Sequence, residues 1–346
     1  MDKVFAQRLA LARKIRCISQ RDLAKALEIS PSSIEKYEKG EMMPSSSVLI
    51  QISNVLGMNI DYFFRPFTLN IDTSKFEFRK KSNLGAKKIE SIKYFICSEI
   101  EKYIEIESII GNQYSFRLDY SNTTTENEEQ AKLLAKRFRK DLNIGQDAIV
   151  SAVELLENCG IKIIEIDEDD KFSGTCIVVS DIPVIVINKN MTSERKRLTA
   201  FHELGHLLMK CDEGVDAEKL CNIFANEVLI PSENFINIIG ASRHDISLIE
   251  LQSIQKEYGI SIDALMAKAH QLNIISQNRY KAYHIKKNKV PGLKEKINNS
   301  LYHAEETNRF KRLVYRALAS EAISTSKASN LLNIPINDVL NNLNLM

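Results

Sequence analysis

The sequence predicts a mainly α-helical protein with one small β-sheet, an α+β fold. Three observations predict this: helical periodicity recurs through most of the chain, three β-branched runs cluster near its middle, and 346 residues exceed one ordinary domain. We expect four parts, which are a five-helix domain at 1–66, a helical connector at 67–130, an α/β core at 131–240 and a helical C-terminal region at 241–346.

The composition is that of a globular protein, with 44% hydrophobic and 27% charged residues. A net charge of +2 gives no overall signal for a polyanion partner, so any nucleic-acid binding must come from a local surface. No apolar run approaches 18 residues and the N-terminus lacks a signal-peptide pattern, which predicts a cytoplasmic protein without a membrane partner. The six cysteines are scattered without a C-x-x-C pair, as reduced core residues would be.

Residues 1–66 show five short helical segments. Ser19 and Ser30 can each cap a helix, and Pro31 suits a first helical position. Gly40 and Gly57 can end the third and fourth helices, the latter running from about 45 to 56. Two short helices joined by a tight turn indicate a helix-turn-helix domain.

Several motifs carry a resemblance here: Gln20-Arg-Asp-Leu-Ala24, Ile29-Ser-Pro-Ser-Ser-Ile-Glu-Lys-Tyr-Glu-Lys-Gly40 and Leu56-Gly57. They resemble the Cro-type (XRE) helix-turn-helix family over residues 4–64. The resemblance implies that the second helix of the pair lies in the major groove of a double-stranded operator. Ser32, Ser33 and Lys36 would then face DNA, and Gln20 would contact the backbone. The alternative is a helix-turn-helix used only for protein contacts.

Residues 76–79 read as an extended piece, and residues 87–110 as a long amphipathic helix that packs within the chain or forms a homodimer. Residues 131–142 predict a helix with a basic face. We expect that face to be solvated, with DNA contact as the alternative.

After that first helix of the core comes a second at 148–158, followed by strands at 161–166, 176–179 and 183–187. Ser193 can then cap a helix that contains His202-Glu-Leu-Gly-His206. Residues four apart share a helical face, so the two imidazoles point toward one metal ion. Glu203 is placed to take a proton from a metal-bound water.

A catalytic zinc site needs a third protein ligand. A second helix at 216–230 can double back on the first, and it offers Glu218, with Asn222 one turn later to hydrogen-bond a ligand. We expect one Zn²⁺ per chain on His202, His206 and Glu218. The rivals for the third position are a more distant glutamate and side chains near the turn (Glu227, Asp212, Glu213, Asp216, Cys211 and Cys221).

These helices carry a second resemblance. Pro183-Val-Ile-Val-Ile-Asn188, the segment 194–208 with the histidine motif, and Glu218-Lys-Leu-Cys-Asn222 resemble the ImmA/IrrE metallopeptidases over roughly residues 75–290. The resemblance implies a gluzincin-like minimal peptidase domain that cleaves helix-turn-helix repressors. Two departures are mild: Ser173 stands where Asp is common, and Cys221 replaces a usual Ala.

Two functions follow. The first is a DNA-binding regulator whose zinc endopeptidase domain cleaves a regulatory protein, with Glu203 as the general base. The alternative is a non-proteolytic autoregulating repressor or antitoxin that binds a toxin, with the zinc domain as scaffold. His244, Tyr258 and His270 remain open as groups that stabilise an oxyanion, and residues 304–340 predict further helices.

Overall fold

A computed structural model describes residues 3–67, 85–111, 116, 123–179 and 181–343. The extended piece expected at 76–79 lies outside the described residues. The chain divides into two compact units: unit 1 is Met1–Tyr114 with Asn308–Met346, and unit 2 is Ser115–Thr307. The four-part division expected from the sequence stays a prediction.

The first part of unit 1 is the expected helix-turn-helix domain. Ser19, Ser30 and Ser45 each cap a helix by accepting a backbone N–H three residues later, and Gly40 and Gly57 end helices in the left-handed conformation. Phe5, Leu9, Leu23, Ile34 and Ile52 fill a core of their own. The elements are α1 (Lys3–Ile15), α2 (Gln20–Ala26), α3 (Pro31–Lys39), α4 (Ser46–Leu56) and the 3₁₀ helix η1 (Ile60–Phe64).

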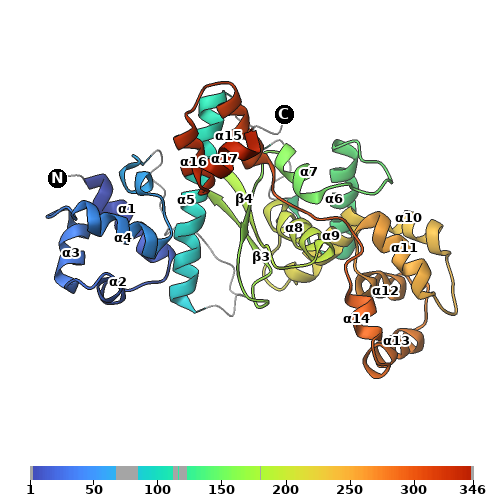
Figure 1. Cartoon of the computed structure of the whole chain (residues 1–346). Coiled ribbons are helices and arrows are strands. Elements are labelled where there is room, and N and C mark those ends of the chain that lie inside the picture. Colours follow the sequence, from blue (N-terminus) through green and yellow to red (C-terminus); the bar gives the residue numbers. More distant parts are fainter. Residues whose placement is uncertain (1–2, 68–84, 112–115, 117–122, 180, 344–346) are drawn as a thin grey trace. The chain divides into compact units, whose positions relative to one another are not determined.

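The predicted long helix is α5 (Ala86–Ile110), and it packs at both of its ends within unit 1. Near its start, the Ser91 hydroxyl donates to the Ile15 carbonyl of α1 at 2.5 Å. Near its end, Tyr103 and Ile106 are buried in a cluster with three C-terminal helices. These are α15 (Arg309–Ala319), α16 (Thr325–Leu332) and α17 (Ile336–Leu343) (Figure 1).

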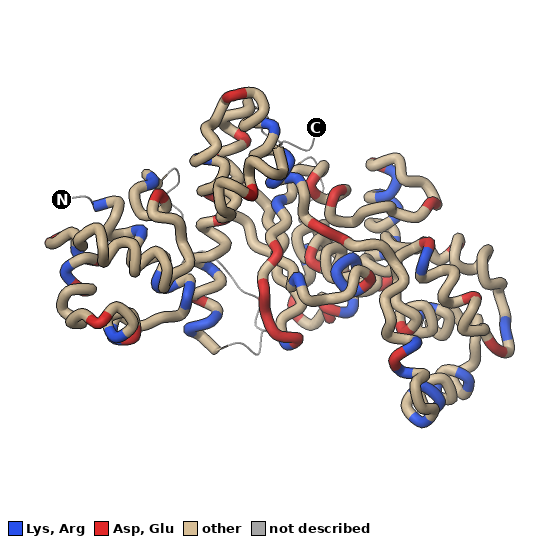
Figure 2. The backbone as a smooth tube through the Cα atoms, in the orientation of Figure 1, with Lys and Arg blue, Asp and Glu red and all other residues tan. Residues whose placement is uncertain are grey.

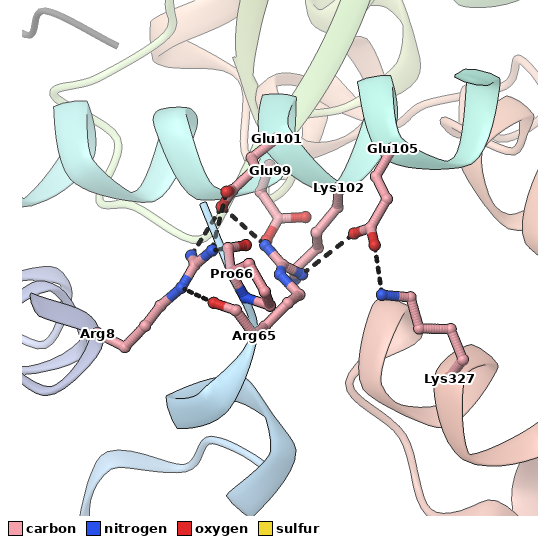
Figure 3. A network of polar contacts seen from close by, with 8 residues as sticks. All are labelled: Arg8, Arg65, Pro66, Glu99, Glu101, Lys102, Glu105 and Lys327. Atoms are coloured by element: carbon pink, nitrogen blue, oxygen red, sulfur yellow. Dashed lines mark hydrogen bonds and ion pairs between the residues drawn. The ribbon is translucent and has the colours of Figure 1, made fainter. Parts of the chain in front are cut away.

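A buried ionic network joins these helices (Figure 3). The Arg8 guanidinium of α1 donates to both carboxylate oxygens of Glu101 on α5 at 2.7 and 2.8 Å, and Arg65 donates to the same carboxylate at 2.8 Å. On the next turn of α5, Glu105 accepts from Lys327 of α16. Because α5 supplies both carboxylates, it links the helix-turn-helix domain to the C-terminal helices.

The pair α16–α17 repeats the local geometry of α2–α3 at a spacing of 305 residues. Ser324 caps α16 as Ser19 caps α2, and Asn333 takes the left-handed turn conformation that Glu28 takes in the first motif. The second helix of this pair carries Asp338 and no Lys or Arg, so it lacks cations for a phosphate backbone.

Unit 2 is built on a three-stranded sheet of order β2-β4-β3. β2 (Lys162–Ile166) runs parallel to β4 (Ile182–Asn188), and β3 (Gly174–Val179) pairs antiparallel on the other side of β4. α8 (Ser193–Leu208) packs on β3 and β4, and α9 (Ala217–Leu229) packs beside α8 (Figure 1). The remaining elements are β1 (Thr123–Thr124), α6 (Glu128–Asp141), α7 (Ala152–Asn158), β5 (Met209–Lys210), α10 (Ser232–Ile239), α11 (Leu248–Tyr258), α12 (Ile262–Gln271), α13 (Gln277–Lys289) and α14 (Leu293–Asn298).

Small differences from the sequence predictions concern helix boundaries and short pairings. Thr192, rather than Ser193, caps α8, and α7 begins at Ala152 rather than near 148. Two-residue strands β1 and β5 form a parallel pair that the sequence did not indicate. In the described part of the chain, every helix is too short or too polar to cross a membrane.

Candidate metal centre

Helix α8 is fixed at its first half by a buried arginine. Arg197 forms an ion pair with Glu305, and both side chains are fully buried. Its guanidinium also donates to the carbonyls of Ile149 and Tyr258 at 2.7 and 3.1 Å. Gly259 lies against it in a left-handed conformation, where any side chain would be strained and would strike the guanidinium. This anchoring sets the position of the turns that follow.

Those turns bring His202 and His206 together with Glu218 of α9. The two Nε2 atoms are 3.1 Å apart. The Glu218 carboxylate lies 3.4 Å from His202 Nε2 and 3.5 Å from His206 Nε2. A tetrahedral zinc ion with bonds of about 2.0–2.1 Å would hold its ligand atoms about 3.3 Å apart. Two imidazoles and a carboxylate at these spacings therefore fit a zinc ion.

The outer nitrogens of both imidazoles contact α9 as well. Asn222 Oδ1 lies 3.1 Å from His202 Nδ1, where the sequence predicted an outer partner. Cys221 Sγ lies 3.1 Å from His206 Nδ1 and is buried. From the sequence, Cys221 is only a rival third ligand, and its contact with His206 is not predicted. Its position three residues after Glu218, on the same helical face, was the available signal.

Glu203 lies between α8 and the edge strand β3. It is 8% exposed, and its Cγ would be 3.6 Å from a Cβ added to Gly174 of β3. The same added Cβ would lie 2.6 Å from Thr199 Cγ2 and 2.8 Å from the Val186 carbonyl oxygen, so only glycine fits there. Gly174 thus lets the strand approach the helix directly beside Glu203.

The rival third ligands have other partners or positions. Glu227 accepts from the Ser232 backbone N–H at 2.8 Å and from Lys268 Nζ at 3.0 Å. Asp216 caps α9 by accepting from the Lys219 N–H at 3.1 Å. Among the described residues, the one group of three ligand atoms with metal-like spacing is that of His202, His206 and Glu218. Asp212 and Glu213 are exposed and Cys211 is half-buried, and none of these three residues belongs to that group.

The three residues left open for oxyanion stabilisation lie in different surroundings. Burial raises the pKa of Tyr258, and its hydroxyl accepts from Asn234 at 2.8 Å. The His270 ring stacks on Tyr280 with centroids 4.8 Å apart, and His244 is exposed. These contacts give Tyr258 and His270 structural partners within unit 2.

The predicted DNA-contacting residues lie on α2 and α3. Ser32 and Lys36 are exposed on α3, on the side opposite its buried Ile34 and Tyr37. The Ser33 hydroxyl lies 2.9 Å from the Ser30 hydroxyl, at the start of the helix. The fourth residue, Gln20, donates to Glu38 at 2.7 Å.

Two parts of the chain match models of known protein families. Residues 6–65 match the family model of a helix-turn-helix domain, and residues 156–270 match that of the peptidase M78, IrrE N-terminal-like domain. A protein of Rhodospirillum rubrum named as an uncharacterised transcriptional regulator in the ATPase CF(0) region is 36% identical over 64 residues. That alignment covers 18% of this chain and 59% of the relative.

Proposed function

We propose that this chain, an XRE-type helix-turn-helix domain joined to an ImmA/IrrE-type domain, is a DNA-binding transcriptional regulator that cleaves a specific regulatory protein. The helix-turn-helix match supports DNA binding, and the related transcriptional regulator supports a role in transcription. The match to a peptidase family supports a metallopeptidase. The substrate class, a repressor-type protein, follows from the family resemblance alone.

The chemistry rests on four residues. His202, His206 and Glu218 would hold one zinc ion, which would supply Lewis-acid activation of the attacking water and of the peptide carbonyl. Glu203 accepts the proton of the attacking water and returns it to the leaving amine. Among the strands that the structure describes, β3 pairs with β4 alone, and an extended peptide could add to its other edge. The observation that carries the proposal is the spacing of the three ligand atoms beside Glu203.

The deciding experiment compares wild type with Glu203→Gln in the producing cells. We expect one regulatory protein to acquire a new N-terminus in wild-type cells only, because the amide cannot accept the proton. Glu213→Gln, which alters an exposed carboxylate in the turn after β5, is the matched control and should behave as wild type. Both variants should keep one zinc per chain by elemental analysis, whereas His202→Ala should lose it.

The alternative is a repressor or antitoxin that uses the zinc domain as scaffold to bind a toxin. It predicts no difference in cleaved proteins between wild type and Glu203→Gln, with zinc and operator binding kept in both. That result, obtained under conditions that relieve repression, would replace the peptidase proposal.

A further inference from the structure

A strongly basic segment of the chain lies outside the helix-turn-helix domain. Residues 277–298, which form α13 and α14, contain seven Lys or Arg and one Glu, a net charge of +6. The whole chain is only +2, so the remaining residues together are −4. Residues 1–66, with ten basic and seven acidic residues, reach +3 over three times the length. Lys and Arg positions recur along both helices (Figure 2).

Two of the seven cations are used inside unit 2. Arg279 donates to Asp245 at 2.6 Å, and Lys287 donates to Asp263 at 2.5 Å. The other five side chains are exposed, and none makes an ion pair or hydrogen bond with any residue that the structure describes. They are Lys281, Lys286, Lys289, Lys294 and Lys296.

The three unpaired lysines of α13 share one face of the helix. At 100° per residue, Lys281, Lys289 and Lys286 fall within an arc of about 140°. The opposite face packs into unit 2, where Tyr283 is buried and donates to Asp263 at 2.6 Å. The fold therefore turns these lysines outward as a row of about 12 Å.

The basic face of α6, expected from the sequence, differs because several of its cations are paired or buried. Lys136 pairs with Glu233 at 2.8 Å, and Arg137 pairs with Asp141 at 3.6 Å. Arg139 is buried and donates to backbone carbonyls, and its burial lowers its pKa. Two of the five cations of α6 are thus ion-paired and a third is buried, whereas five of the seven cations of residues 277–298 are exposed and make no ion pair with a described residue.

We infer that α13 and α14 form a second DNA-contact surface, one that binds phosphates without reading sequence. Lysine ammonium groups suit this role because they act as point charges on the backbone and displace its counterions. A membrane surface fits less well, because an interfacial helix needs a continuous apolar face, and the non-basic face of α13 is packed inside the protein. The inference rests on the proposed DNA binding by the helix-turn-helix domain, which would raise the local concentration of duplex.

The test uses the full chain with all five lysines changed to Gln. Binding is measured against a duplex selected by wild type from a random pool and against an unrelated duplex, over a range of salt concentrations. If two or three lysines contact phosphate, the affinity for both duplexes should fall by about tenfold to a hundredfold. The salt slope should fall by about two to three. The ratio between the two duplexes should stay at the wild-type value.

The matched control changes five exposed lysines elsewhere in unit 2 to Gln and should bind DNA nearly as wild type. These are Lys140, Lys171, Lys189, Lys210 and Lys256. The variant Ser32→Ala with Lys36→Ala should instead lose the ratio between duplexes while keeping most of the salt slope, which tests the helix-turn-helix domain separately. An unchanged salt slope in the α13–α14 variant would overturn the inference. So would unchanged DNA binding together with lost binding to phosphatidylserine vesicles, which would assign the surface to a membrane.

Discussion

Three residues of α9 surround the candidate metal centre from one helical face. Glu218 approaches both Nε2 atoms, and residues three and four positions later contact the two Nδ1 atoms. When Nε2 is the ligand atom, Nδ1 carries the proton and donates it. Asn222 Oδ1 and Cys221 Sγ are both able to accept it. We therefore propose that α9 sets the tautomer of each imidazole and supplies the third ligand.

We predict that Cys221→Ala weakens zinc binding by about 10- to 100-fold, because His206 loses the acceptor that orients it. Cys221→Ser should recover most of the affinity, since its hydroxyl can accept the same hydrogen bond. Competition with a chelator measures both. Cys211→Ala, in the half-buried segment after β5, is the control. Equal affinities for the Ala variant and wild type would leave Cys221 with a packing role only.

The sequence indicated the pair of histidines directly, because a four-residue spacing on a helix leaves little freedom. The sequence favoured Glu218 over Glu227 because Glu218 is nearer to His206 along the chain. Helical geometry favours Glu218 as well. Nine residues at 100° each place the two glutamates on opposite faces of α9. The position of Cys221 three residues after Glu218 indicates its helical face, but its contact with His206 also depends on how closely α8 and α9 pack.

At the scale of elements, Glu227 holds the end of α9 to its neighbours. Its carboxylate accepts from the backbone N–H and hydroxyl of Ser232 at the start of α10, and from Lys268 of α12. Burial opposes its ionisation, but Lys268 and Ser232 together outweigh burial and hold the pKa of Glu227 below 4.5. Burial also lowers the pKa of Lys268. The Glu227–Lys268 pair joins α9 to α12, on the face of α9 opposite Glu218.

Glu227→Ala should therefore destabilise unit 2 by about 3–5 kcal/mol, since it leaves the Lys268 ammonium buried without its carboxylate. In wild type, the contribution of Glu227 is present above pH 4.5 and is lost as the pH falls through the lower pKa of the folded state. Urea unfolding at several pH values measures both effects. Glu233→Gln, which breaks an exposed pair with Lys136, should cost less than about 1 kcal/mol. A similar loss of unfolding free energy in the two variants would contradict a structural role for the buried Glu227–Lys268 pair.

The bounds of helices with clear caps and apolar periodicity could be predicted from the sequence. Those of the very polar helix α13 and of the short strands β1 and β5 could not. Serine caps and left-handed glycines gave α2, α3 and α4 nearly to the residue. From the sequence alone, residues 286–289 read as a short basic loop, but they form the end of α13. Four lysines and an arginine leave Tyr283 as the single buried residue of this helix, so it shows no apolar periodicity. β1 and β5 have only two residues each, which is too short to show the alternation of apolar and polar residues that predicts a strand.

At the scale of the whole molecule, unit 1 takes residues from both ends of the chain. Tyr103 and Ile106 of α5 are covered by α15–α17, and Arg309 donates to the buried Glu107 at 3.0 Å. No sequence pattern indicates that residues after 308 pack against the N-terminal part. Such returns depend on long-range packing, which local periodicity does not encode.

Removing residues 308–346 should lower the melting temperature of unit 1 on the order of 10 °C, because it exposes these side chains and leaves buried charges unpaired. Unit 2 should melt as before and keep its zinc. Calorimetry with and without a chelator assigns each transition, since zinc removal should shift that of unit 2 alone. A chain ending at 298 is the comparison: it also lacks Glu305, the partner of Arg197, and should lose the zinc-dependent transition. Unchanged melting of unit 1 in the first truncation would contradict this account.

The split of unit 1 has a consequence for synthesis on the ribosome. Residues 115–307 must be made before the last helices arrive. At about 5–20 residues per second that interval lasts roughly 10–40 s. During it, α5 lacks the contacts that Lys327 and Arg309 make with Glu105 and Glu107. A chain terminated before residue 309 would never acquire them, so α5 gains these contacts only after α15 and α16 have been made.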